Sequence, residues 1–330
     1  MNWLQTHWYR ITPLHLILFP ISLFFRALVA LRREMYRNGS LASDQLLLPV
    51  IVVGNISVGG TGKTPLTLAL AQQLVEHGWH PLIVSRGFGG STQQPRYVDA
   101  SSDAQQVGDE PLLMARRNIC PVWIGRDRAD TARAALQAHP QCDVVLCDDG
   151  LQHYRLQRDV EIAVVDGARR FGNGLMLPAG PLREPVSRLQ SVDAVVVNGD
   201  DAPSGQYVMR LSGSVFYNLL DPDKKACADH FQGQNNHAAA GIGNPQRYFQ
   251  HLEALGIPFT PHAFPDHHPY SATDLAFADC DAILLTEKDA VKCAAFADGR
   301  YWVLRVDAQI DSALLEHILR KIESHGSQTA

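Results

Sequence analysis

Short apolar runs separated by turn residues recur along the chain and alternate with segments of helical periodicity. Each run is almost uniformly apolar and rich in Val, Ile and Leu, which is typical of strands buried on both faces of a parallel sheet. In the segment 63–78, apolar residues return at every third or fourth position, as in the helices that cover such a sheet. The pattern predicts an α/β fold, and its first expected strands are 46–53, 80–85, 142–149, 161–166 and 192–198.

A second group of elements follows residues 199–206, a stretch of Gly, Asp, Pro and Ser that is typical of a domain boundary. Residues 207–219 alternate like a strand and are expected to form a connecting ribbon. Further strands and helices, ending with a helix at 312–322, then complete a smaller α/β unit. We therefore expect three parts: an amino-terminal segment, a larger domain and a smaller carboxyl-terminal domain, at 1–40, 41–205 and 206–330.

The amino-terminal segment has a different pattern. Residues 14–31 are strongly apolar, but Pro20 and Arg26 interrupt the run that a membrane-spanning helix requires. The start of the chain also lacks the basic region of a signal peptide. The composition favours a helix lying in the plane of a membrane interface, and a helix packed on the domain's own core is the alternative. The flanking aromatic and basic residues are Trp3, Trp8, Tyr9, Arg32, Arg33 and Arg37.

The charge distribution agrees with an anionic surface as the partner of this end. Residues 1–40 contain five arginines and one glutamate, a net charge of +4, whereas the whole chain carries −5, so the remainder carries −9. The overall balance gives no nucleic-acid signature. The six cysteines form no C-x-x-C pair, which indicates buried thiols in a reducing compartment rather than disulfides or a zinc site.

The most specific chemical signal is the glycine-rich turn from Gly54 to Thr64, between the first apolar run and the first helix. Backbone N–H groups of such a turn and the positive end of the following helix bind phosphate. We expect Lys63 at the β- and γ-phosphates of ATP and the Thr64 hydroxyl on Mg²⁺. Ser57 replaces the first glycine of G-x-x-x-x-G-K-[ST], which makes the loop a variant; an ordinary strand-to-helix turn is the alternative. The residues expected to bind the nucleotide here are Ser57, Val58, Gly59, Gly60, Thr61, Gly62, Lys63 and Thr64.

Two adjacent carboxylates, Asp148 and Asp149, end the apolar run at 142–149. In phosphate-loop proteins the acid that holds Mg²⁺ comes from the end of a neighbouring strand, because that edge of the sheet faces the phosphates. Two adjacent acids at a strand end are unfavourable unless a cation neutralises them. The pair is therefore expected to hold Mg²⁺ with Thr64, and a solvated turn is the alternative.

Two loops and the start of one predicted helix contain further polar candidates. Arg86 begins a glycine-rich loop, Arg86-Gly-Phe-Gly-Gly90, and Arg183 and Glu184 lie in the Gly- and Pro-rich segment 171–185. Asp109 opens a predicted helix, where it acts either as a first-turn acid or as a functional carboxylate.

These segments together resemble one family, the tetraacyldisaccharide 4′-kinases, which are the lipid A 4′-kinases of Gram-negative inner membranes. The likeness runs along nearly the whole chain, and eight motifs in the right order make it specific. The motifs are Val58-Gly-Gly-Thr-Gly-Lys-Thr-Pro65, Ser85-Arg-Gly-Phe-Gly-Gly90, Gly108-Asp-Glu-Pro111, Asp148-Asp-Gly-Leu-Gln-His153, Leu177-Pro-Ala-Gly-Pro-Leu-Arg-Glu-Pro185, Ala240-Gly-Ile-Gly-Asn-Pro245, Pro265-Asp-His267 and Thr286-Glu-Lys-Asp289.

The resemblance implies a P-loop NTPase-like fold and phosphoryl transfer from ATP to the 4′-hydroxyl of an acylated glucosamine disaccharide 1-phosphate, giving lipid IVA. It implies a peripheral or monotopic enzyme at the cytoplasmic face of the inner membrane. The expected partners are the lipid substrate and the membrane surface, with no nucleic acid and no obligatory protein partner.

The resemblance also implies roles for single residues. Asp109 would take the proton from the 4′-hydroxyl, and His267 would pair with it and tune it. Asp148 and Asp149 would act through Mg²⁺. The resemblance places Lys288 and Asp289 at the nucleotide. It places Arg86, Arg183 and Glu184 near the substrate. Because His267 and Lys288 belong to the second unit, catalysis would require closure of a cleft.

Two other classes compete with this interpretation. A phosphate-loop GTPase or ATPase switch at the membrane surface would hydrolyse nucleotide without phosphorylating a metabolite, and Thr286-Glu-Lys-Asp289 loosely resembles the guanine signature Asn-Lys-x-Asp. A membrane-surface scaffold would only bind nucleotide. An acid and histidine placed to deprotonate a sugar hydroxyl distinguish the kinase from both.

Overall fold

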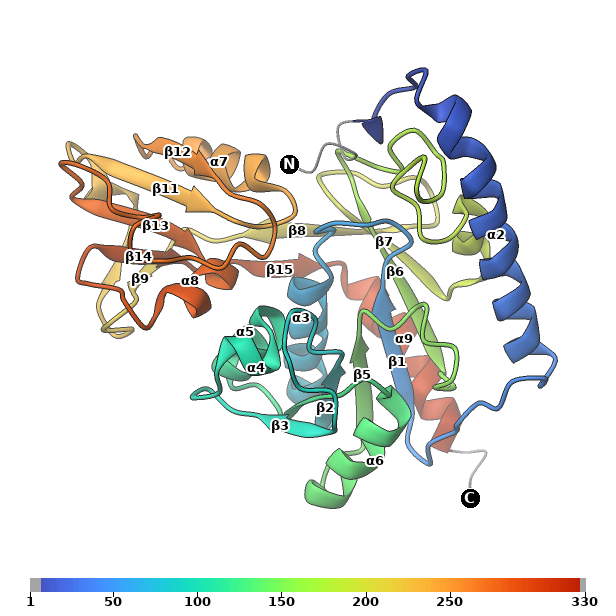
Figure 1. The fold of residues 1–330 in the computed structure, drawn as a ribbon. Helices are drawn as coiled ribbons and strands as arrows, with labels where there is room; N and C mark the ends of the chain where they lie inside the picture. Colours follow the sequence, from blue (N-terminus) through green and yellow to red (C-terminus); the bar gives the residue numbers. More distant parts are fainter. Residues whose placement is uncertain (1–6, 327–330) are drawn as a thin grey trace.

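Two β-sheets form the cores of two units, which are connected by the strands β8 (Tyr207–Ser212) and β15 (Asp307–Ile310) (Figure 1). The computed structural model describes residues 7–326, so Trp3, expected to flank the amino-terminal helix, lies outside the described residues. Within residues 7–326 the larger sheet has nine strands and the smaller sheet has six.

The nine-stranded sheet is mostly parallel, with β1 at its centre and antiparallel strands at both edges, β3 and β15. The strand order is β15-β8-β7-β6-β1-β5-β2-β4-β3. The expected mostly parallel P-loop NTPase-like sheet is confirmed. The other strands are β1 (Val50–Gly54), β2 (Pro81–Ser85), β3 (Arg96–Val98), β4 (Val122–Ile124), β5 (Val144–Asp148), β6 (Val160–Asp166) and β7 (Ala194–Asn198).

Helices cover both faces of this sheet because its central strands are apolar on both sides. Ile51 and Val53 of β1 belong to the core under one set of helices, and Val50 and Val52 belong to the core on the opposite face. The first set comprises α3 (Lys63–Glu76), α5 (Asp109–Arg117) and α9 (Ser312–Gly326), the opposite face is covered by α6 (Arg128–Ala138), and α4 (Ala104–Val107) directly precedes α5.

The smaller sheet has the order β10-β9-β14-β13-β11-β12 and also carries helices on both faces. One face packs on α7 and the 3₁₀ turn η2, and the other packs on α8. Its elements are β9 (Phe216–Asn218), β10 (Lys225–Ala226), η2 (Ala228–Phe231), β11 (Asn236–Ala240), α7 (Pro245–Ala254), β12 (Thr260–Ala263), β13 (Ala282–Thr286), α8 (Glu287–Cys293) and β14 (Tyr301–Leu304).

The end of the chain returns to the larger unit, which corrects one expectation. We assigned the final helix to the second unit, but β15 pairs with β8 in the nine-stranded sheet, and Leu314, Ile318 and Ile322 of α9 are buried in the core beside α3. The helix itself lies where the sequence predicts it, but its partner differs from the expected one, because an apolar stripe does not specify the surface that covers it.

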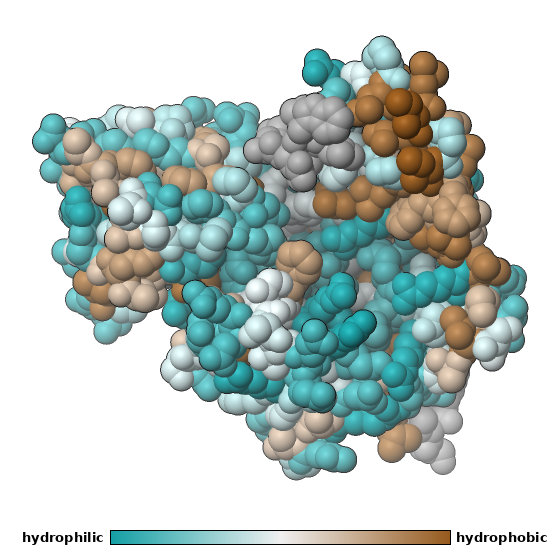
Figure 2. All heavy atoms as spheres, in the orientation of Figure 1, coloured by the Kyte–Doolittle hydropathy of each residue, from teal (hydrophilic) through white to brown (hydrophobic). Residues whose placement is uncertain are grey.

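The amino-terminal helix α2 (His15–Arg37) runs along one edge of the larger unit, away from the smaller one (Figure 1). It is continuous through Pro20 and is long and apolar enough, by length and composition, to cross a membrane. Most of its large apolar side chains are exposed, and Figure 2 shows the apolar surface that they form. These are Leu16, Ile17, Phe19, Ile21, Leu23, Phe24, Leu28 and Leu31.

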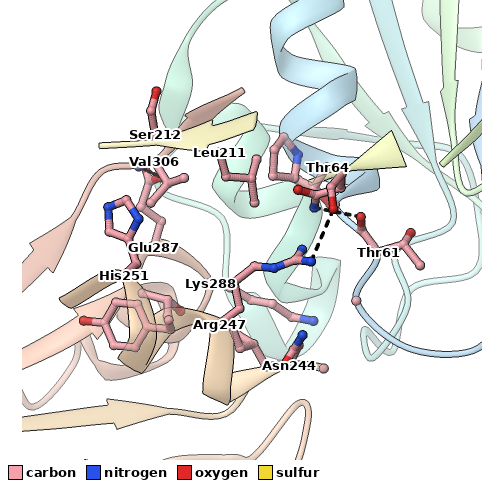
Figure 3. A pocket seen from close by; sticks show the side chains of 18 of the residues that line it. Thr61, Thr64, Leu211, Ser212, Asn244, Arg247, His251, Glu287, Lys288 and Val306 are labelled. Atoms are coloured by element: carbon pink, nitrogen blue, oxygen red, sulfur yellow. Dashed lines mark hydrogen bonds between the residues drawn. The ribbon is translucent and has the colours of Figure 1, made fainter. Parts of the chain in front are cut away.

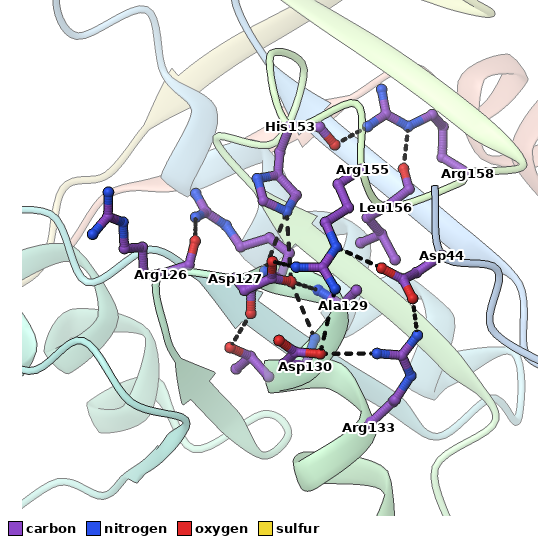
Figure 4. Close-up of polar contacts among 12 residues, drawn as sticks. Asp44, Arg126, Asp127, Ala129, Asp130, Arg133, His153, Arg155, Leu156 and Arg158 are labelled. Carbon is purple, nitrogen blue, oxygen red and sulfur yellow. Dashed lines mark hydrogen bonds and ion pairs between the residues drawn. The ribbon is translucent and has the colours of Figure 1, made fainter. Parts of the chain in front are cut away.

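An ion-pair network fixes the loop that follows β5 (Figure 4). Arg155 of this loop contacts Asp44, which precedes β1, and Asp127, whose side chain caps the amino terminus of α6. Arg133 of α6 also pairs with Asp44. The network therefore connects the start of β1, the loop after β5 and α6 in one place.

Candidate active site

The phosphate loop connects β1 to α3, as the strand–turn–helix pattern predicts. Gly59 and Gly62 have φ angles of 102° and 100°, which residues with a side chain rarely adopt. Gly62 is the N-cap residue of α3, so the amino terminus of that helix opens directly onto the loop. Lys63 and Thr64 are the first residues of the helix, and both line a cavity.

The predicted acidic pair lies beside this loop. β5 is parallel to β1, and Asp148 is opposite Val53 in register, so both strands end at the same edge of the sheet. Asp149 Oδ1 is 3.5 Å from Lys63 Nζ and 3.2 Å from Arg183 Nη1. Burial raises the pKa of Asp149, but the charges of Lys63 and Arg183 lower it more strongly, to about 2.

Asp148 has the opposite electrostatic character. Its Oδ1 accepts a hydrogen bond of 3.1 Å from Thr67 of α3, while its buried Oδ2 has no hydrogen-bond partner among the described residues. Burial, followed by the charges of Glu110 and Asp149, raises its pKa to about 7. An unpaired carboxylate oxygen next to α3, on whose first turn Thr64 lies, is a ligand that a hard cation such as Mg²⁺ prefers.

A second pair lies between the two units. Asp109, in the first turn of α5, is 3.0 Å from His267 Nδ1, although the two residues are 158 positions apart in the chain. His267 Nε2 is 3.3 Å from Lys288 Nζ. Because an ammonium group only donates, Nε2 must accept, so we assign the ring proton to Nδ1, from which it is donated to Asp109.

The surroundings keep Asp109 ionised. Burial alone would raise its pKa, but the hydrogen bond from His267 and the charges of Lys288 and Lys292 bring it below its ordinary value. The glycine-rich loop at 86–90 covers the pair: the Phe88 ring is 5.0 Å from the imidazole of His267. The geometry brings together the acid and the histidine that the resemblance implies, and the loop lies against them.

Lys288 and Asp289 have different surroundings. Lys288 lines the cavity and pairs with Glu110 at 2.9 Å and with Asp266 at 3.1 Å. Asp289 is fully buried, accepts hydrogen bonds from the Gly241 amide and the Thr286 hydroxyl, and does not line the cavity. Its contacts are those of a structural residue. The geometry therefore gives no support to an Asp289–nucleotide contact or to a guanine-binding signature.

A cavity of about 650 Å³ opens beside the phosphate loop (Figure 3). Thr61 and Thr64 of the first unit lie on one side, and Asn244 and Arg247 at the start of α7 lie on the other. A cavity of this size is in the range of small-ligand sites. Its position next to the expected triphosphate site suits the ribose and base of a nucleotide.

Several residues around the phosphate loop were not predicted. Asn198, the last residue of β7, donates to the Thr61 carbonyl at 2.9 Å. Arg169, held by Asp166 at the end of β6, donates to the carbonyls of Gly60 in the phosphate loop and Gly243 in the second unit. The rule that identified Asp148, a polar residue at the end of a buried strand, also fits Asp166 and Asn198 and would have found them.

The three residues expected near the substrate have different surroundings in the structure. Arg86 is exposed, and Arg183 pairs with Asp149. Glu184 is almost fully buried, and its oxygens accept from Gln152, Tyr154 and Arg188. Because these donors occupy its carboxylate, the geometry supports a structural role for Glu184 rather than a contact with substrate.

Comparisons with known proteins agree with this arrangement. The model of the tetraacyldisaccharide-1-P 4′-kinase family matches residues 14–323. The tetraacyldisaccharide 4′-kinase of Methylobacillus flagellatus is 50% identical over 97% of this chain and 96% of its own length. That of Dechloromonas aromatica is 49% identical over 100% of this chain and 99% of its own.

A solved structure shows the same fold. The crystal structure of an "apo" form of LpxK from Aquifex aeolicus in complex with ATP has a TM-score of 0.76 and 27% sequence identity to this chain. The match covers 92% of this chain and 98% of that one. The sequence motifs, the geometry of the site and these similarities agree, and the chain belongs to the tetraacyldisaccharide-1-P 4′-kinase family.

Proposed function

We propose that this chain transfers the γ-phosphoryl group of ATP to the 4′-hydroxyl of a tetraacylated glucosamine disaccharide 1-phosphate, giving lipid IVA. The observation that carries the proposal is the presence of two charged pairs, one at the phosphate loop and one between the two units. Lys63 and Asp149 lie at the phosphate loop, and Asp109 and His267 lie where the second unit meets the first. Lys288 lies between the two pairs, because it lines the cavity that Lys63 also lines and its ammonium group contacts His267.

The chain's own residues account for binding and proton transfer. N–H groups of the phosphate loop and the Lys63 ammonium would bind the β- and γ-phosphates. Asp109, ionised and hydrogen-bonded to His267, would accept the proton of the sugar hydroxyl, and the imidazole would hold the carboxylate in place. Contact between the units, through Arg169 and Gly243 at the phosphate loop, would exclude water from the reacting groups.

The donor set at this edge fits Mg²⁺. Asp148 offers a buried carboxylate oxygen with no partner among the described residues, and Thr64 and Asp149 are the other expected ligands. When bound, the metal would offset the negative charge of the β- and γ-phosphate oxygens.

Substrate chemistry and the exposed face of α2 support action at the inner-membrane surface. Acyl chains keep such a lipid in the bilayer, and the apolar face of α2 suits insertion into an interface. The opposite face contacts the larger unit from His15 near its start to Arg33 near its end, so a perpendicular crossing would carry that unit into hydrocarbon. We therefore infer a peripheral or monotopic enzyme.

A single assay tests the activity. The protein is incubated with γ-labelled ATP, Mg²⁺ and the lipid in detergent micelles, and label is followed in lipid and in free phosphate. We expect label in the lipid, and none with Lys63→Met. Label released only as phosphate would indicate a hydrolytic switch, and label retained in ATP would indicate a scaffold; either result would refute the kinase.

A second assay tests the membrane contact. Replacing the exposed Leu16 and Phe24 with aspartate removes two apolar side chains from the interface, and we expect vesicle affinity to fall at least about tenfold for each. Sedimentation with anionic vesicles measures the change. Unchanged sedimentation would show that another surface binds the membrane.

A further inference from the structure

The loop at residues 175–184, called here the connecting loop, contacts both α2 and the phosphate loop. Its first half faces α2, and its second half runs beside residues 56–58 of the phosphate loop, with Leu182 in a β-bridge to Ser57. It therefore provides a direct physical link between the helix with the exposed apolar surface and the loop expected to bind ATP.

The contacts with α2 come from one narrow face of that helix. His15 and Ser22, two turns apart, are its buried residues. His15 Nε2 is 3.0 Å from the Ala179 carbonyl, and Ser22 Oγ is 2.9 Å from the Met176 carbonyl. The Ala179 amide donates to Ser22 Oγ at 3.0 Å. The two side chains thus bind backbone groups of a segment outside the named strands and helices, in addition to the bonds from the Gly180 amide to the Met176 carbonyl and from the Asn173 side chain to the Ala179 carbonyl.

The second half of the connecting loop forms equally short bonds with the phosphate loop. The Val58 amide donates to the Pro181 carbonyl at 2.8 Å, and the Arg183 amide donates to the Ile56 carbonyl at 2.7 Å. The Arg183 guanidinium also contacts Asp149, the partner of Lys63. A displacement of the connecting loop would therefore move both the first turn of the phosphate loop and the Asp149–Lys63 pair.

An apolar cluster joins the same three segments. Ile56 of the phosphate loop packs with Met176 and Leu182 of the connecting loop, and Phe25 and Val29 of α2 cover this cluster. The exposed apolar residues of α2 lie outside it. The helix therefore has two separate faces, one built into the phosphate-loop region and one free for a membrane.

We propose that His15 and Ser22 are positioning residues of the active site, which hold the connecting loop and, through it, the phosphate loop and Asp149 in the geometry that binds ATP. The turnover measurement in its test rests on the proposed function, whereas the affinity measurement requires only that the protein binds ATP. Truncating Ser22 removes the partner of the buried Ala179 amide and one of the two hydrogen bonds to the Met176 carbonyl, which keeps the bond from the Gly180 amide, so the loop loses its attachment to α2 and relaxes toward water.

The test compares Ser22→Ala and His15→Gln with Phe24→Ala, a truncation on the exposed face of the same helix. Turnover is measured with lipid in detergent micelles, ATP affinity by calorimetry, and membrane contact by vesicle sedimentation. We expect Ser22→Ala to raise the KM and Kd for ATP about tenfold, with unchanged vesicle binding. We expect a smaller increase for His15→Gln, which retains a side-chain donor, and partial rescue by Ser22→Thr.

Phe24→Ala is expected to weaken vesicle binding at unchanged ATP affinity. A merely structural role would reduce the fraction of folded, active protein, and so lower kcat, while leaving KM and Kd for ATP unchanged; this result would overturn the proposal. Wild-type ATP affinity in both buried-face variants would overturn it as well. Failure of the proposed function would appear differently, as a wild-type protein that binds ATP but does not label the lipid.

Discussion

The replacement of Asp109 by asparagine gives the sharpest test of the site. Asparagine has the same shape and still accepts from His267 Nδ1 at the 3.0 Å separation, but it cannot take a proton. Loss of a general base lowers turnover by about 10² to 10⁴, equivalent to about 3 to 5 kcal/mol in the activation free energy. Since Asp109 does not line the cavity beside the phosphate loop, we expect ATP affinity to change little.

The assay is kcat for lipid phosphorylation at saturating ATP, with the Kd for ATP measured by calorimetry on the same samples. Asp143→Asn is a matched control, because Asp143 forms a similar carboxylate–histidine contact with His80, at 3.2 Å, on an exposed surface. The control should retain wild-type turnover. A kcat for Asp109→Asn within about threefold of wild type, below the smallest loss expected for a general base, would refute the assignment.

Two further predictions concern the phosphate-loop region. In Gly243→Ala, an ideal Cβ would lie 2.3 Å from the Gly60 amide nitrogen, so we expect the units to separate and the KM for ATP to rise. Gly299→Ala, whose Cβ would have no heavy atom of the described residues within 4 Å, should leave the kinetics unchanged. Equal kinetics in both variants would contradict the inferred contact. The pKa of Asp149, lowered from 3.8 to about 2, contributes stability above pH 4 that is lost as pH falls toward 2. The advantage of wild type over Asp149→Asn in urea-unfolding free energy should therefore shrink by about 0.5 to 1 kcal/mol between pH 6 and pH 3, once partial exposure is allowed for. A constant difference would show that the carboxylate is not linked to Lys63.

Much of the larger unit could be predicted because its signals are local. The apolar runs, the glycine-rich turn and the helical segment after it specify a strand, a phosphate loop and a helix within 27 residues, 50–76. Parallel strands end at a common edge, so the sequence also predicted that Asp148 lies near the loop. The same reasoning extends to Asn198, because it too is the last residue of a buried parallel strand.

Other features depend on which distant segments meet. The pairing of β15 with β8 and the docking of α9 are non-local, and a short alternating strand or an apolar stripe does not name its partner. The Asp109–His267 pair came from family resemblance, because no pattern within either segment connects residues 158 positions apart.

The amino-terminal helix shows most clearly which features the sequence determines and which depend on the tertiary structure. Its sequence determined an apolar, arginine-flanked helix suited to an interface, because composition and periodicity are properties of the segment itself. Only the tertiary structure decided which face remains exposed and that His15 and Ser22 bind the connecting loop. The physical reason is that hydrogen bonds to another segment's backbone depend on where that backbone lies, and its position results from packing of the whole chain.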